Sequence, residues 1–199
     1  MFQVTLIRPG LTEFDRQHRI QGSLDLPLIA EGELELDEIF AAIQNEGLEV
    51  LYCSPTNPAA STAEQLGERL GIPVKMLEGL SNCDLGLWQG RTIEEIKSRY
   101  PKVYKQWRES PGSVCPPGGE ANSESLERSM KSLVKPLKKE IRFGLVVCEP
   151  LATLISCSLR GCKHELPATY CCRERGPLVE KLDVVSVNGE PRATAVSSS

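Results

Sequence analysis

Histidine and cysteine side chains carry much of the nucleophilic and acid–base chemistry of enzymes, and here their number and spacing are restrictive. The chain has two histidines, His18 and His164, which lie far apart in the sequence. None of the eight cysteines is followed by five residues and then an arginine, the spacing that a cysteine phosphatase needs. The D-x-D sequence that an aspartyl phosphotransferase needs is also absent. We therefore do not expect chemistry through either of these two nucleophiles.

A group of cysteine and histidine residues in the last quarter of the chain consists of residue types that zinc prefers as ligands. Its members are Cys157, Cys162, His164, Cys171 and Cys172. The spacing contains no C-x-x-C pair, and Cys157 falls in an apolar segment, where cysteine behaves as a small hydrophobic residue. We expect no metal and no cofactor, and a metal- or redox-responsive domain stays open as an alternative.

The predicted elements indicate which loops could position a site. Strands are predicted at residues 2–7, 48–53, 72–76, 143–148 and 184–187, and helices at residues 31–46, 61–70, 92–100, 101–107, 124–140 and 151–159. Strands that alternate with helices are typical of an α/β sandwich with a largely parallel sheet. Ligands bind such sheets at the carboxyl ends of the strands. The loops after Ile7, Cys53 and Cys148 are therefore the expected place for a site.

Length, composition and charge fit one globular domain. The 199 residues are 40% hydrophobic and 25% charged, with a net charge of −4. Such a chain is too long for a disulfide mini-scaffold and too apolar for a disordered protein. We predict a single domain over residues 1–190 and a flexible tail over residues 191–199, where small and polar residues predominate. The mildly acidic balance predicts no nucleic-acid partner, which would need a basic stripe.

Targeting signals are not visible in the sequence. No apolar run approaches the roughly 18 residues of a membrane-spanning helix. The first residues also lack the basic start of a secretory signal. We expect a cytoplasmic location, where the thiols would be reduced, and no membrane partner.

The loops at the predicted sheet edge carry motifs in a characteristic order. The first motif is the run RPGLTEFDRQHRIQG, from Arg8 to Gly22. Matching positions follow at Asp25, Pro27-Leu28, Gly32 and residues 52–55, 62–64, 86–90, 117–120 and 146–147. Together they resemble the histidine phosphatase superfamily, in its phosphoglycerate mutase-like branch, whose first motif is R-H-G-x-T-x-x-N-x-x-x-R-x-Q-G. The resemblance covers about residues 1–190 and implies a three-layer α/β/α sandwich with a mostly parallel central sheet.

The chain departs from the family pattern at the positions that perform the chemistry. The two catalytic histidines of the family correspond here to Pro9 and Glu149. Its second phosphate-binding arginine corresponds to Pro58, and its acidic general acid to Asn82. The asparagine of its first motif corresponds to Asp15. The resemblance therefore implies that none of the catalytic positions is intact.

Arg8 is the phosphate-binding residue of the family pattern that the chain keeps. The residual anion or substrate pocket implied by the resemblance consists of Arg8, Asp15, Gln21 and Gly22. We predict that Arg8 forms a salt bridge with Glu149, which closes the old centre to anions. In the alternative, Glu149 points to solvent and Pro150 merely reshapes the loop.

The functional prediction follows from the chemistry of the replaced residues. Proline has no nucleophilic side-chain atom, and asparagine cannot deliver a proton as a carboxylic acid does. We predict a catalytically inactive family member, a pseudoenzyme, with a binding or regulatory role toward an unknown protein or small-molecule ligand. The alternative is an active phosphatase or phosphomutase that acts on a small phosphorylated metabolite with altered catalytic residues. The sequence does not specify an oligomeric state.

Overall fold

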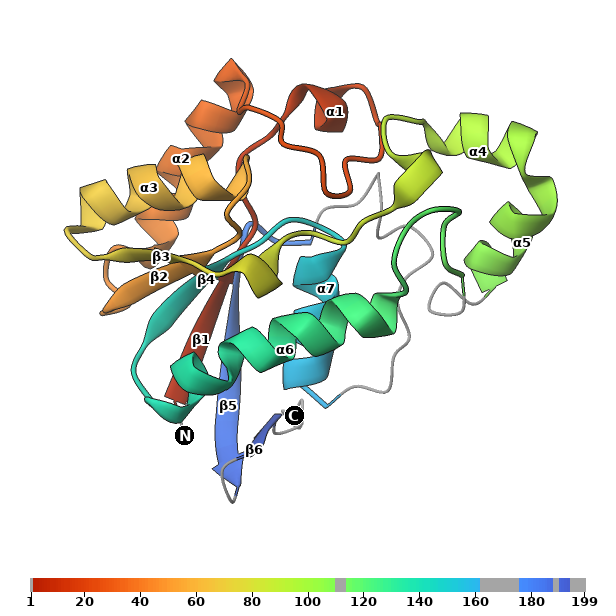
Figure 1. Ribbon diagram of the computed structural model, residues 1–199. Helices are drawn as coiled ribbons and strands as arrows, with labels where there is room; N and C mark the ends of the chain where they lie inside the picture. The colour runs from red at the N-terminus through yellow and green to blue at the C-terminus, as the bar shows by residue number, and fades with distance from the viewer. Residues whose placement is uncertain (1, 110–113, 162–175, 188–189, 194–199) are drawn as a thin grey trace, which may run out of the picture.

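A six-stranded sheet forms the centre of the computed structural model, which describes residues 2–109, 114–161, 176–187 and 190–193 (Figure 1). The strands are β1 (Phe2–Ile7), β2 (Val50–Cys53), β3 (Val74–Met76), β4 (Phe143–Val146), β5 (Val179–Val187) and β6 (Glu190–Ala193). Their order across the sheet is β3-β2-β4-β1-β5-β6. The pairs among β3, β2, β4 and β1 are parallel, whereas β5 pairs antiparallel with both β1 and β6. The predicted mostly parallel sheet is confirmed.

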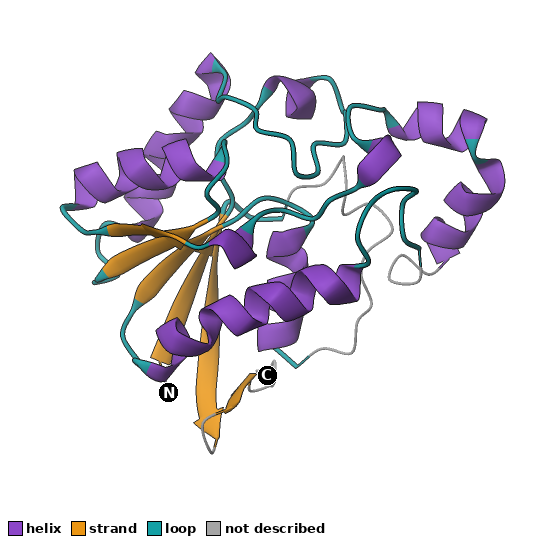
Figure 2. Ribbon diagram, in the orientation of Figure 1, coloured by secondary structure: helices purple, strands orange, loops and turns teal. Residues whose placement is uncertain are grey.

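Helices cover both faces of this sheet and complete a three-layer α/β/α sandwich (Figure 2). α2 (Ala30–Ile43) and α3 (Ala59–Leu70) lie on one face, and α6 (Asn122–Lys138) and α7 (Leu151–Leu159) lie on the other. The shorter helical elements are α1 (Glu13–Arg16), α4 (Ile93–Arg99), α5 (Pro101–Glu109) and the 3-10 turns η1 (Glu78–Leu80) and η2 (Gly86–Trp88). α1, α4 and α5 lie beyond the carboxyl end of β1, at the edge where ligands bind in such folds (Figure 1).

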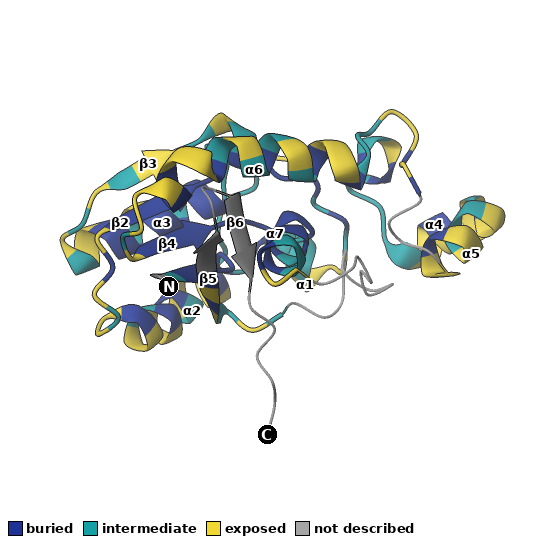
Figure 3. Ribbon diagram, turned by 90° about the horizontal axis from the view of Figure 1, so that it is seen from below, coloured by how far each residue is buried: buried dark blue, intermediate teal, exposed yellow. Residues whose placement is uncertain are grey.

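Side chains that alternate along the strands divide the core into two layers. In β2, Val50 and Tyr52 pack in the layer of α6 and α7, whereas Leu51 and Cys53 pack in the layer of α2 and α3. All four are buried, and the inner strands stay dark blue between the helical layers in Figure 3. A parallel sheet with both faces covered needs such continuous apolar strands.

The C-terminal strands differ from the prediction. β5 begins at Val179, five residues before the predicted start at residue 184, because its pairing with β1 extends back to Ile7. Residues 191–193, predicted as part of a flexible tail, belong to β6 and pair with β5. This pairing satisfies backbone groups that a free tail would leave to water. Residues 194–199 lie outside the described residues.

The predictions about the cysteine and histidine cluster, metal binding and membrane spans concern other parts of the chain. The cluster residues Cys162, His164, Cys171 and Cys172 lie outside the described residues. Within the described ranges, no three His, Cys, Asp or Glu side chains gather as a metal-binding group would. None of the described helices is both long enough and apolar enough to cross a membrane.

Candidate active site

Arg8 occupies the centre of the loops at the carboxyl edge of the sheet. It directly follows β1, and its side chain is only 4% exposed. Its Nε donates to Glu149 Oε1 at 2.6 Å, which confirms the predicted salt bridge. Its Nη1 donates to the Pro177 carbonyl oxygen at 2.9 Å and to Glu180 Oε2 at 3.2 Å. Groups of the protein itself therefore accept hydrogen bonds from Nε and Nη1, two of the three guanidinium nitrogens that could bind an anion.

Glu149 is held in place from both sides of its carboxylate. It follows β4, the parallel neighbour of β1, so parallel pairing brings its loop beside Arg8. While Oε1 accepts from Arg8, Oε2 accepts from the Thr153 backbone N–H at 3.2 Å, in the first turn of α7. Its side chain is 15% exposed. The alternative in which Glu149 points to solvent is therefore wrong.

Glu180, on β5, is the second carboxylate on Arg8, and it was not predicted from the sequence. It lies opposite Leu6 in the antiparallel register, and its side chain is 11% exposed. Its Oε1 accepts from Ser156 Oγ at 2.7 Å and pairs with Arg160 Nη2 at 2.5 Å. Glu149, Arg8, Glu180 and Arg160 thus form a chain of alternating charges that is neutral as a whole. We call these four residues, together with Asn82, the Arg8 centre.

A signal for Glu180 exists in the sequence. Glu180 alternates with Leu182 and Val184, which are both buried in the layer of α6 and α7. A carboxylate on the buried face of a strand requires a cationic partner, because an unpaired buried charge is costly. A strand prediction that reached back to residue 179 would therefore have indicated Glu180 as a partner for an arginine.

Gly176 packs directly against the Arg8 guanidinium. A Cβ atom built on Gly176 would lie 2.6 Å from Arg8 Cζ and 2.6 Å from Nη2. The Arg8 backbone N–H also donates to the Leu178 carbonyl oxygen at 2.8 Å. The segment from Gly176 to Glu180 therefore lies against Arg8, and a side chain at position 176 would force the guanidinium to shift.

Asn82 joins three loops around the centre. Its Nδ2 donates to the Gly22 carbonyl oxygen at 2.8 Å and to the Glu149 carbonyl oxygen at 2.7 Å. Its Oδ1 accepts from the Leu151 backbone N–H at 3.4 Å. The side chain is buried, and both of its donated bonds require an amide, because an ionised carboxylate has no proton to donate. Asn82 is therefore built in as a structural connector.

Pro9 and Pro58, the two prolines for which the resemblance implies catalytic positions, are both buried. Pro58 immediately precedes α3, and its carbonyl oxygen accepts from the Thr62 backbone N–H at 3.0 Å. Pro9 lies between Arg8 and Gly10, whose N–H donates to Thr62 Oγ1 at 3.3 Å. Neither proline has a side-chain atom that could attack phosphate or hold its charge.

The remaining residues of the predicted residual pocket serve local structure. Asp15 accepts from the backbone and hydroxyl of Thr12, at 2.7 Å each, in the capping box of α1. Gln21 donates to the Leu24 and Asn57 carbonyl oxygens at 3.3 and 3.5 Å. The Gly22 carbonyl oxygen contacts the Arg8 centre by accepting a hydrogen bond from Asn82. Among the described residues, the structure records no hydrogen bond that connects Asp15 or Gln21 to Arg8.

Two buried cysteine thiols near these loops, Cys53 and Cys83, are poor nucleophiles. Burial raises the pKa of Cys53 to about 12, with a smaller contribution from the charge of Glu64. Burial likewise raises the pKa of Cys83 to about 12. Cys148 is buried in the layer of α2 and α3, on the side of the sheet away from Glu180. The thiolate is the reactive form, so neither Cys53 nor Cys83 is suited to act as a nucleophile near neutral pH.

Comparison with known proteins places this site in a family. The model of the histidine phosphatase superfamily (branch 1) matches residues 4–155. Phosphoserine phosphatase 1 of Hydrogenobacter thermophilus is 29% identical over 202 residues, which cover 96% of each chain. Glucosyl-3-phosphoglycerate phosphatase of Mycobacterium tuberculosis is 30% identical over 145 residues, which cover 71% of this chain and 63% of that protein.

A solved structure agrees with these sequence matches. The structure of a mycobacterial glucosyl-3-phosphoglycerate phosphatase with VO3 superposes with a TM-score of 0.81, at 25% identity and over 96% of each chain. Bacillus stearothermophilus YhfR shares the fold, with a TM-score of 0.80 at 21% identity over 99% of this chain and 97% of that one. Since the family model spans most of the sheet and its loops, the chain belongs to the histidine phosphatase superfamily (branch 1).

Proposed function

We propose that this chain is a non-catalytic member of its family, which keeps the fold and acts by binding. The observation that carries the proposal is the pairing of Arg8 with Glu149 and Glu180. Glu149 stands where the resemblance implies a catalytic histidine, and it neutralises the one phosphate-binding residue that the chain retains.

Charge and competition both oppose phosphate at the Arg8 centre. A phosphate group would have to displace two carboxylates that belong to the same chain and are held beside Arg8 by strands β4 and β5. While they remain, each repels a phosphate dianion, and burial strengthens this repulsion relative to water. Pro9, beside the centre, has no nucleophilic atom, and Asn82 cannot act as a general acid. A nucleophile and a general acid normally act as a unit in catalysis.

Phosphate release from p-nitrophenyl phosphate and 3-phosphoglycerate tests the proposal. We expect no release by the wild-type chain above that of an Arg8→Ala variant. A phosphatase of known activity toward p-nitrophenyl phosphate is the positive control for the assay, and circular dichroism checks that the Arg8→Ala variant is folded. Release by the wild-type chain that Arg8→Ala abolishes would overturn the proposal.

The second candidate is an active phosphatase with altered catalytic residues. The names of the relatives favour it, since they include a phosphoserine phosphatase and a glucosyl-3-phosphoglycerate phosphatase. Phosphoserine and glucosyl-3-phosphoglycerate are therefore the substrates to add to the same assay. This candidate predicts turnover of one of them with saturation kinetics and competitive inhibition by vanadate, whereas the non-catalytic proposal predicts neither.

A further inference from the structure

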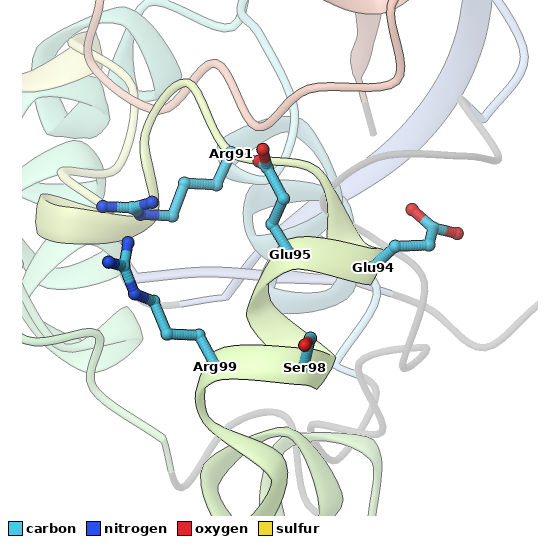
Figure 4. A pocket seen from close by; sticks show the side chains of 5 residues that line it. All are labelled: Arg91, Glu94, Glu95, Ser98 and Arg99. Carbon is cyan, nitrogen blue, oxygen red and sulfur yellow. The ribbon is translucent and has the colours of Figure 1, made fainter.

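A surface hollow on α4 carries two arginines and lies apart from the residues of the Arg8 centre. It is lined by Arg91, Glu94, Glu95, Ser98 and Arg99 and has a volume of about 510 Å³ (Figure 4). We call these five residues the α4 hollow. The function proposed above makes no use of them.

Arg91 is oriented by a backbone contact that leaves its outer nitrogens available. Its Nε donates to the Leu87 carbonyl oxygen at 2.8 Å, at the end of the loop that contains η2. Figure 4 shows the guanidinium groups of Arg91 and Arg99 on the same side of the hollow, and both line it. Two cations that face one space repel each other, and an anion between them would remove this repulsion.

The carboxylates of the hollow are directed elsewhere. Glu95 Oε2 accepts from the Thr92 backbone N–H at 2.8 Å in the capping box of α4, and it lies 3.8 Å from Arg19 Nη1. Glu94 points away from both arginines in Figure 4. In the part of the chain that the structure describes, neither Arg91 nor Arg99 forms an ion pair with a carboxylate. This contrasts with Arg8, which has two.

We propose that the α4 hollow binds a phosphate monoester group. A guanidinium presents a planar fork of N–H donors that matches phosphate oxygens, and two such forks suit a tetrahedral dianion better than a single carboxylate. Ser98 adds a hydroxyl donor to the lining. The hollow is polar and lies on the surface, so either a free phosphorylated molecule or a phosphorylated side chain of a protein can reach it. The proposal does not depend on whether the Arg8 centre hydrolyses phosphate.

The experiment is a titration of the full chain followed by nuclear magnetic resonance. Phenylphosphonate, a dianion without a hydrolysable ester bond, serves as the probe, and the signals of the arginine Nε–H groups report the place of binding. We expect the largest shifts at Arg91 and Arg99. A second arm uses inorganic phosphate and a third uses a phosphoserine peptide. An affinity at least tenfold higher for the peptide than for inorganic phosphate identifies a protein side chain as the source, and similar affinities identify a small molecule.

Matched variants separate a site from a general charge effect. Arg91→Gln/Arg99→Gln should weaken phenylphosphonate binding at least tenfold. Arg16→Gln/Arg108→Gln removes the same charge from exposed positions outside the hollow and should change the affinity less than twofold. Equal losses in the two variants, or the absence of shifts at Arg91 and Arg99 in the wild-type chain, would overturn the proposal. Phosphate release in the enzymatic assay would instead overturn the non-catalytic function and leave this site unaffected.

Discussion

The Arg8 centre and the α4 hollow use the same side chain in opposite ways. Arg8 is buried and has two carboxylates within hydrogen-bond distance. Arg91 and Arg99 line an open surface, where the neighbouring carboxylates are used in a helix cap or point away. The guanidinium chemistry is identical in both places, so the difference comes from the residues that each element places around it. Whether an arginine of this fold can bind an outside anion therefore depends on the carboxylates that surround it.

The largest effect should come from removing the cation of the buried network. Arg8→Met would leave Glu149 and Glu180 close together and mostly buried without their shared partner. We expect the free energy of unfolding to fall by about 3–5 kcal/mol, the usual cost of breaking a buried ion pair from one side. Urea denaturation at pH 7 measures it. The exposed Arg16→Met serves as control, and a loss below about 1 kcal/mol for Arg8→Met would show that the pairing is not structural.

The cover over Arg8 gives the next largest expected effect. Gly176→Ala places a Cβ 2.6 Å from the guanidinium, which must shift away from its hydrogen-bond partners. Such overpacking should lower the free energy of unfolding by about 1–3 kcal/mol. In an Arg8→Met background the collision is relieved, so the same substitution should then cost much less. Equal costs in the two backgrounds would contradict the contact.

The ion pair of Glu120 with Arg128, which contacts the Asn82 loop, should give a smaller and pH-dependent effect on the free energy of unfolding. Burial by itself raises the pKa of Glu120, but hydrogen bonds from Arg128 and the Asp84 backbone outweigh it and lower the pKa overall. A lowered pKa in the folded state stabilises the protein above the pKa of the unfolded state, and this stabilisation is lost as the pH falls through the folded value. Arg128 also donates to the Asn82 carbonyl oxygen at 3.0 Å, so the pair supports the loop that reaches Glu149.

Glu120→Gln should therefore lower the free energy of unfolding at pH 7 by about 1 kcal/mol, a value that allows for screening by solvent. The deficit relative to wild type should shrink as the pH falls below about 4.3, the ordinary pKa of a glutamate in the unfolded state, toward the lower pKa of the folded state. Denaturation curves at a series of pH values measure it. A deficit that is the same at pH 7 and pH 3 would show that the charge of Glu120 contributes nothing.

The smallest effect on the stability of the protein should come from substitutions in the α4 hollow. Arg91→Gln and Arg99→Gln remove exposed or half-exposed charges that repel each other, so each should change the free energy of unfolding by less than about 0.5 kcal/mol. Thermal unfolding without added anion measures this. A large loss in either variant would mean that the arginine is structural, as Arg8 is, and the contrast between the two regions would disappear.

Local pattern was enough to predict much of the fold. Apolar runs and their alternation gave five strands of the sheet and the four helices that cover it, because burial on both faces constrains each residue of an inner strand. The start of β5 was missed because its first residues, from Val179 to Asp183, mix charged and apolar side chains. β6 was missed because a short antiparallel edge strand depends on its partner more than on its own sequence.

The part of the site that follows parallel strands could be predicted, because sequence motifs fix the positions of its residues. Arg8 and Glu149 follow adjacent parallel strands, and the family resemblance together with their opposite charge predicted the pairing. Glu180 was not predicted, because its place depends on an antiparallel register that spans the length of the chain. The role of Asn82 as a connector was also missed, since a buried amide reveals its partners only once three loops have been brought together.

One consequence of the antiparallel strand β5 concerns the substitutions that would make Arg8 available to an anion. β5 pairs with β1 and carries Glu180, which accepts from Arg8. The segment that leads into β5 places the Gly176 backbone against the same guanidinium. The substitution Glu149→His alone would leave the Glu180 carboxylate and the Gly176 backbone against Arg8. Freeing Arg8 would therefore require changes in β5 as well as at position 149.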